Sequence, residues 1–210
     1  MTLQHLIERT QKRFPQAGAV EIAMLASQAV REFNEYTRAR RETATLQTDA
    51  ETAVYGLESL LDSQGRSVAD RLIAVEAVVL EGRQLPRWNS AYGHYGLCWW
   101  TEAGGLGIGF SEGDGATPRP HYPDGQTVQV TFISTGAALD PDELAGTPDI
   151  DPRYAPDILS YIGGWLAEEA SDYAQAEYHF NKWELAKRQG RKTANQGDTA
   201  DGFHIRPLPI

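Results

Sequence analysis

The chain lacks the features that mark several large classes of protein. It contains a single cysteine, Cys98, so an internal disulfide is excluded and a secreted disulfide scaffold is not expected. It has no apolar run of about 18 residues, which argues against a membrane span. The charged start MTLQHLIERTQKRF does not have the form of a signal peptide. Together these absences indicate a protein of a reducing cell interior, or of an assembly built there, with no membrane partner.

Positive charge is also scarce. The chain has 19 basic and 29 acidic residues, which gives a net charge of −10. This charge argues against a protein that coats nucleic acid in general, although it allows a surface past which DNA slides without adhering. The rest of the composition is ordinary, with 41% apolar and 23% charged residues. A chain of 210 residues can bury a sizeable core and fits one domain, or one domain with an insertion.

Apolar spacing predicts helices at both ends of the chain. Thr2 can cap a first helix, which Pro15 ends. A second helix is expected over residues 19–40, with an apolar face at helical spacing: Ile22, Leu25, Ala26, Ala29, Val30 and Phe33. Residues 149–189 show two further apolar stripes joined by a short acidic break, and Asp172 with Gln175 has the spacing of a capping box. The C-terminal pair is therefore expected to form a helical hairpin.

The middle third has the composition of an antiparallel β region with long loops. Residues 127–134 alternate, with Val128, Val130 and Phe132 expected on one face. Segments rich in β-formers also occur at residues 43–48, 52–57, 72–80 and 106–110, although residues 52–57 fit a helix as well. The expected loops include residues 89–104 and 113–125.

No segment carries a convincing catalytic or metal-binding motif. Cys98 and His94 are four residues apart in an expected loop, where a small buried thiol is the commoner outcome. Trp99, Trp100 and Glu102 allow a sugar platform with an acid, against the commoner role of tryptophan in cores and interfaces. The glycine-rich stretch 104–115 lacks the third glycine of a dinucleotide loop, and the acidic cluster Asp140, Asp142 and Glu143 lacks calcium-loop spacing. No catalytic residue, metal or cofactor is therefore expected.

The aromatic residues of the C-terminal hairpin are the most unusual feature. Trp165, Tyr173, Tyr178, Phe180 and Trp183 present more aromatic area than one hairpin can bury within itself. The expected core or ring contacts of the hairpin are Tyr161, Trp165, Tyr173, Phe180 and Trp183. They can close a core against the N-terminal helices, form an interface, or do both on different faces. A polar, glycine-containing stretch follows, and the chain ends in a possible binding arm: Phe203, His204, Ile205, Arg206, Pro207, Leu208, Pro209 and Ile210. A frayed terminus is the simpler explanation of that ending.

The order of these parts resembles the head-to-tail adaptor, or connector, proteins of tailed bacteriophages. The likeness runs over roughly residues 2–190 and is carried by the helical AMLASQAVREFNE, the strand sections TATLQTDAETAVYGL and RLIAVEAVVLEGRQLPR, the β-turn-β piece FSEGDGATPRPHYPDGQTVQVTFIS and the closing DIDPRYAPDILSYIGGWLAEEASDYAQAEYHFNKWELAKR. The long β section and the two long loops depart from shorter members of the family. On this resemblance residues 52–57 are a strand rather than a helix.

The resemblance implies a structural virion protein of the neck, assembled in the host cytoplasm, and no enzyme. Family members form a dodecameric ring beneath the portal protein, with the helices as its wall, the β part toward the tail and the C-terminal arm on the portal. The implied partners are the portal protein, tail (nozzle or tail-tube) proteins, other copies of the chain, and genomic DNA that passes through without sequence-specific binding. The hypothesis that follows is that the aromatic hairpin is both core and ring contact, and that truncation after Arg188 abolishes portal binding but leaves the fold intact.

The sequence thus predicts an α+β fold: a helical bundle with a central antiparallel β insertion and an extended C-terminal arm. The expected boundaries are 1–42 for the N-terminal helices, 43–138 for the β insertion, 139–189 for the hairpin and 190–210 for the arm. A stopper or tail terminator, a cellular helical-hairpin interaction module and a small carbohydrate-active enzyme remain as alternatives. A tetratricopeptide array is disfavoured because no repeat near 34 residues occurs.

Overall fold

The computed structural model describes residues 1–89, 91, 94–102, 104–113, 115, 117–120 and 122–200, with side chains to residue 196. The chain divides into two compact units. A helical unit contains Met1–Arg40 and the chain from Thr135 onward, and a β unit contains Arg41–Ser134. The fold is α+β, as predicted.

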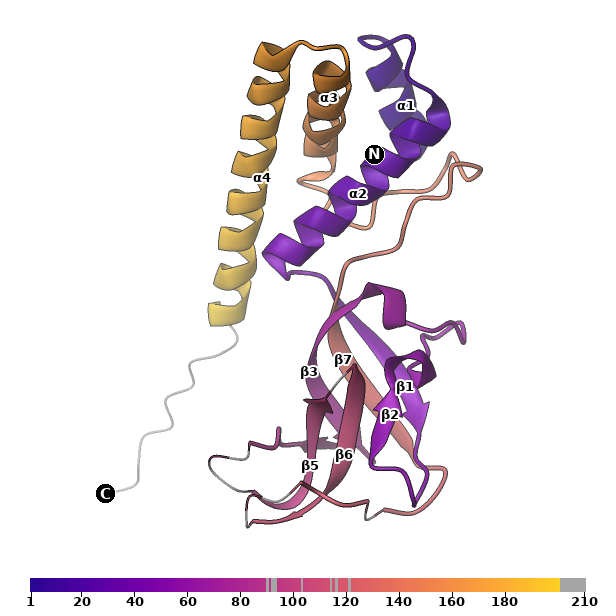
Figure 1. Ribbon diagram of the computed structural model, residues 1–210, viewed down its shortest axis with the longest axis vertical. Coiled ribbons are helices and arrows are strands. Elements are labelled where there is room, and N and C mark those ends of the chain that lie inside the picture. The colour runs from indigo at the N-terminus through magenta and orange to yellow at the C-terminus, as the bar shows by residue number, and fades with distance from the viewer. Residues whose placement is uncertain are drawn as a thin grey trace, which may run out of the picture. The chain divides into compact units, whose positions relative to one another are not determined.

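Four α-helices make the helical unit: α1 (Leu3–Gln11), α2 (Ala19–Thr37), α3 (Ile158–Glu169) and α4 (Tyr173–Ala200). A 3-10 turn, η3 (Ala155–Asp157), leads into α3. The helices α3 and α4 run side by side, and α2 crosses beside them (Figure 1). The predicted apolar face of α2 is buried apart from the half-buried Leu25, and it joins residues of α1, α3 and α4 in one core.

The caps explain where the N-terminal helices begin and end. The Thr2 hydroxyl accepts a hydrogen bond from the His5 backbone N–H at 3.4 Å, as predicted for the cap of α1. At the start of α2 the Glu21 carboxylate accepts from the Gly18 N–H at 3.3 Å. The helix α2 ends at Thr37, before the predicted Arg40, because Arg38 adopts a left-handed conformation with φ of 53°.

The helix α4 continues to Ala200, past the predicted end near Gln189. Tertiary contacts hold this last part against the rest of the unit. A Cβ at Gly190 would lie 2.5 Å from the Phe33 ring, so the chain passes closely over α2 there. The Arg191 guanidinium donates to the Tyr36 carbonyl at 2.8 Å, and the Thr193 and Tyr154 hydroxyls are 2.9 Å apart. Residues 190–200 are therefore part of the helical unit rather than of an extended arm.

Two antiparallel sheets form the β unit. The first has the order β1 (Arg41–Gln47), β7 (Thr127–Ser134), β3 (Leu72–Leu80) and β4 (Arg83–Leu85). The second has the order β2 (Val54–Gly56), β6 (Gly105–Glu112) and β5 (Tyr95–Glu102). Short 3-10 turns, η1 (Leu57–Ser59) and η2 (Ala69–Arg71), lie in the connections. Side chains of both sheets share one core, in which Val128, Val130 and Phe132 of β7 are fully buried, as their alternation predicts.

The strand β5 corrects the prediction of a loop over residues 89–104. Three successive residues of β5, Cys98, Trp99 and Trp100, are buried. A strand covered on both faces shows no polar alternation, and so it gives no period-two signal in the sequence. The predicted strand over residues 52–57 is confirmed at Val54–Gly56, after which the chain turns into η1.

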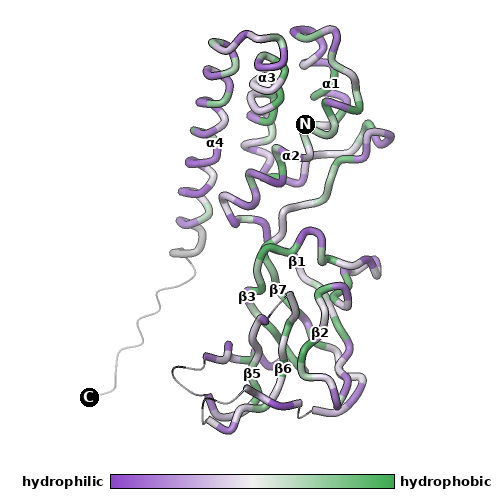
Figure 2. Tube along the Cα trace, in the orientation of Figure 1, coloured by the Kyte–Doolittle hydropathy of each residue, from purple (hydrophilic) through white to green (hydrophobic). Residues whose placement is uncertain are grey.

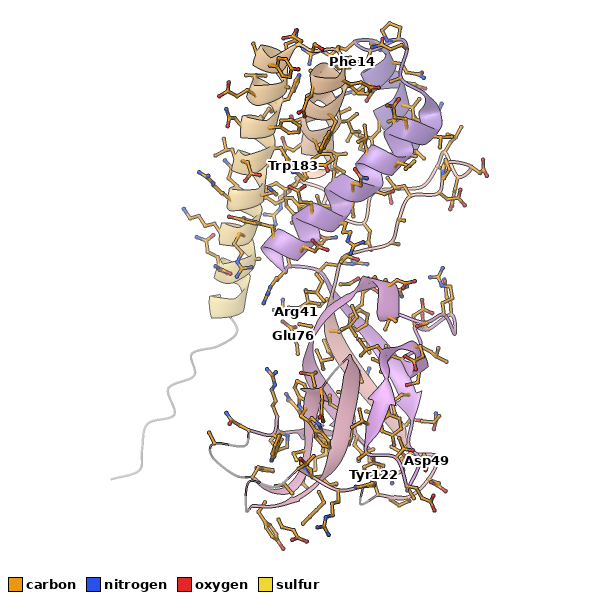
Figure 3. The ribbon with its side chains drawn as sticks, in the orientation of Figure 1. Phe14, Arg41, Asp49, Glu76, Tyr122 and Trp183 are labelled. Atoms are coloured by element: carbon orange, nitrogen blue, oxygen red, sulfur yellow. The ribbon has the colours of Figure 1, made fainter. Side chains whose placement is uncertain are left out.

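Side-chain contacts join strands and loops of the β unit that are distant in the sequence. Arg41 on β1 and Glu76 on β3 form a two-point ion pair, with N–O distances of 2.6 and 3.3 Å (Figure 3). At the other end of the unit the Tyr122 hydroxyl lies 2.5 Å from the Thr52 carbonyl oxygen and 3.0 Å from that of Ile108. Burial raises the pKa of Tyr122, so this hydroxyl stays a donor at all ordinary pH values.

Candidate functional site

The α3–α4 hairpin has the geometry that its capping signal predicts. The Gln175 backbone N–H donates to the Asp172 carboxylate at 3.1 Å, and Ser171 makes the turn with a φ of 60°. Two glycines on α3 let α4 approach closely. A Cβ at Gly164 would lie 2.6 Å from the Phe180 ring, and one at Gly163 would lie 3.2 Å from the His179 ring.

The five predicted hairpin aromatics fall into two groups. Tyr161 and Trp183 are buried in the core of the helical unit, with ring centroids 5.5 Å apart (Figure 3 labels Trp183). Trp165 and Tyr173 are 44% and 67% exposed, and Phe180 is half-buried, with its ring edge-on to Trp165 at 5.8 Å. Core and surface roles are thus divided among these residues.

A shallow groove lies where Trp165 meets α2. It has a volume of about 340 Å³, and its lining combines apolar and acidic residues: Glu21, Leu25, Trp165, Leu166, Glu168 and Glu169. On the adjoining surface of α2, Val20 and Met24 are each 60% exposed. Large exposed apolar side chains that gather beside a groove are typical of a docking surface.

A second exposed apolar strip lies on α4. Tyr178 and Leu185 are 65% and 55% exposed and lie seven residues apart, on the face of α4 opposite the buried Trp183. Leu185 was not among the predicted site residues. Its position off the buried stripe is the signal that could have identified it, because a large aliphatic residue on the polar face of a helix is unusual. In Figure 2, α4 is hydrophilic over most of its length.

The buried His179 side chain, next to Tyr178 on α4, has only one of its two ring nitrogens in a hydrogen bond. Arg13 donates to His179 Nε2 at 3.5 Å, which leaves the ring proton on Nδ1. His179 Nδ1 is buried and has no hydrogen-bond partner among the described residues. Burial, followed by the nearby Arg13 and Lys182 charges, lowers the pKa of His179 from its ordinary value of 6.5.

We predict that this histidine makes the helical unit less stable in mild acid. The unfolded chain binds a proton near pH 6.5, whereas the folded chain resists it to a lower pH, so stability is full above 6.5 and declines as pH falls below that value. Urea unfolding followed by helical circular dichroism from pH 7.5 to 5 measures the slope. His179→Gln should flatten it, and His5→Gln, at an exposed histidine, should not. Equal slopes in all three chains would contradict the assignment.

The cysteine and the paired tryptophans considered from the sequence lie in the β unit. Cys98 is fully buried, and burial raises its pKa to about 11, so the thiol stays protonated near neutral pH and is shielded from solvent. Trp99 and Trp100 are also buried, and the Trp100 indole N–H donates to Glu102 at 3.3 Å. Over the described part of the chain, no three His, Cys, Asp or Glu side chains gather as a metal site would need. No helix within it is both long and apolar enough to span a membrane.

The proposed arm, Phe203–Ile210, lies outside the described residues. A match to a known protein family covers a few residues beyond the described ones. The family model for the SU10 adaptor protein matches residues 1–205, which includes both units. No curated protein matches the chain. A match of this extent shows that the chain belongs to the SU10 adaptor protein family, whose members are structural head-to-tail adaptors of bacteriophages.

Proposed function

We propose that copies of this chain form a ring in the virion neck, between the portal protein and the tail, and that the genome passes through it. The observation that carries the proposal is the exposure of Val20, Met24, Trp165, Tyr178 and Leu185 on a helical unit that already has a complete core. A monomer gains nothing from these side chains in water, whereas a subunit buries them against its neighbours.

The exposed apolar side chains beside the groove (Val20, Met24 and Trp165) differ from those on α4 (Tyr178 and Leu185), and this difference favours a ring. Contacts between unlike surfaces repeat head to tail, and they close into a ring when the rotation between neighbours divides a full turn. The resemblance to other adaptors supports twelve copies. The net charge of −10 supports passage of DNA, because a channel of like charge does not hold the genome.

We propose that the C-terminal residues 203–210 bind the portal. Because α4 extends to Ala200, a truncation that tests this proposal must leave the helix whole. A chain ending after Arg188 would also lose Gly190, Arg191 and Thr193, which contact α2 and the segment before α3. The cut belongs after Ala200, where α4 ends. We expect the chain ending at Ala200 to keep its melting temperature within a few degrees and to lose portal binding.

The measurement is co-expression with the portal protein of the same phage, followed by affinity capture and negative-stain electron microscopy. Rings bound to portal with the full chain, and free portal with the chain ending at Ala200, are the expected results. Full-length chain that never associates with portal or with itself would overturn the proposed function. Unchanged capture of the shortened chain would overturn only the role of the arm.

A further inference from the structure

The groove between α2 and α3 is lined by three carboxylates, of which Glu21 also accepts the Gly18 N–H at the start of α2. Glu168 and Glu169 lie in the last turn of α3, where the helix dipole is also negative, and that turn contains no basic residue. Glu21 lines the opposite side from α2. None of the three carboxylates has an ion-pair partner among the described residues. Leu25 and Trp165 supply an apolar floor between them.

The outer face of α4 has the opposite charge. Arg188 and Lys192 follow Leu185 at helical spacing, so Tyr178, Leu185, Arg188 and Lys192 share one exposed face. Neither cation forms an ion pair within the described chain, although the protein has an excess of ten negative charges. In Figure 3, nitrogen-tipped side chains project from α4 on the side away from α3.

These two surfaces are complementary in both apolar character and charge. We propose that the outer face of α4 of one copy docks in the α2–α3 groove of the next, with Tyr178 and Leu185 against Leu25 and Trp165. Arg188 and Lys192 then face Glu21, Glu168 and Glu169. This is the helix-in-groove mode of recognition, with apolar anchors in the centre and a charged rim. The inference rests on the proposed function and specifies which surfaces of the chain form its self-contact.

The outer face of α4 cannot fill the groove of its own chain, so the α4 that docks there comes from another copy. The opposite face of α4 is committed to its own core, where Trp183 is 1% exposed. The outer face therefore points away from the groove beside its own α3. Because the donor and acceptor surfaces differ, each bound copy leaves one free surface of each kind. Addition therefore continues head to tail, and it ends in a ring when the rotation between neighbours divides a full turn.

Cross-linking between introduced cysteines tests this arrangement, with little background because Cys98 is fully buried. The full chain carrying Met24→Cys and Leu185→Cys is treated with a short bis-maleimide and run on a denaturing gel. A head-to-tail contact should produce a ladder of dimers, trimers and larger species. Each single variant should remain monomeric, and Arg9→Cys with Leu185→Cys is the matched pair on an exposed position outside the groove.

Charge reversal supplies the second readout. Arg188→Glu with Lys192→Glu should lower the ladder yield by about tenfold, since two attractive rim pairs become repulsive. Adding Glu168→Lys and Glu169→Lys to the same chain should restore it. Lys12→Glu with Arg83→Glu makes the same change in net charge at exposed positions that belong to neither surface, and it should have little effect.

The outcomes separate this inference from the proposed function. Dimers in the Leu185→Cys single variant would indicate a symmetric contact and overturn the pairing. Portal-bound rings whose subunits fail to cross-link at this pair would overturn the pairing and leave the adaptor function standing. Absence of any ring or portal complex, despite a ladder, would overturn the function instead.

Discussion

Trp183→Ala should lower the free energy of unfolding of the helical unit by about 3–5 kcal/mol, the usual range for removing a buried large aromatic side chain. Trp183 is 1% exposed and has ring contacts with Phe33 and Tyr161 at centroid distances of 5.8 and 5.5 Å. Its indole N–H also donates to Glu32 at 3.1 Å. The substitution removes packing between α2, α3 and α4 in a single step.

Urea unfolding followed by circular dichroism at 222 nm measures this effect, because the helices dominate the signal there. Tyr178→Ala is the matched control on the same helix, since Tyr178 is 65% exposed, and it should change the free energy of unfolding by less than about 0.5 kcal/mol. Two chains of equal stability would show that Trp183 does not hold the helices together.

Gly107→Ala should lower the free energy of unfolding of the β unit by about 1–3 kcal/mol, the usual effect of overpacking. Gly107 on β6 is paired with Trp100 on β5, and a Cβ at this glycine would lie 2.1 Å from the indole. The indole covers the space that a side chain would occupy. Because Trp100 is 5% exposed and its ring is rigid, it must leave its position to admit a methyl group.

A double-mutant cycle identifies the clash as the cause. The cost of Gly107→Ala, measured by chemical unfolding with tryptophan fluorescence, should fall to near zero in a Trp100→Ala background. If the cost is the same in both backgrounds, the glycine is required for backbone reasons and contact with the indole is not involved.

Local signals in the sequence identify most of the secondary structure of this chain. The N-caps at Thr2 and Asp172 and the alternation in β7 each depend on neighbouring residues alone, and each is confirmed. The strand β5 and the end of α4 depend on distant contacts. Trp99 and Trp100 are buried on opposite faces of β5, so the strand shows no alternation of apolar and polar residues. The helix α4 continues past Gly190 because this glycine packs closely against the Phe33 ring.

The candidate site was less accessible to sequence reasoning. The aromatic content of the hairpin indicates an interface, but periodicity alone does not separate the buried Trp183 from the exposed Trp165. Their separation depends on where α2 crosses the hairpin, which is a tertiary property. The groove needs α2 and α3 together, from segments more than a hundred residues apart, and no local pattern predicts such a meeting.

The first and last strands of the β unit are neighbours, and this has a consequence for how such a chain can evolve. The unit begins with β1 and ends with β7, and these neighbouring strands pair Arg41 with Ile133. Both junctions therefore meet at one place, as in domains that tolerate transplantation. A lineage can therefore exchange the whole β unit as a cassette while the helical unit keeps a core of its own.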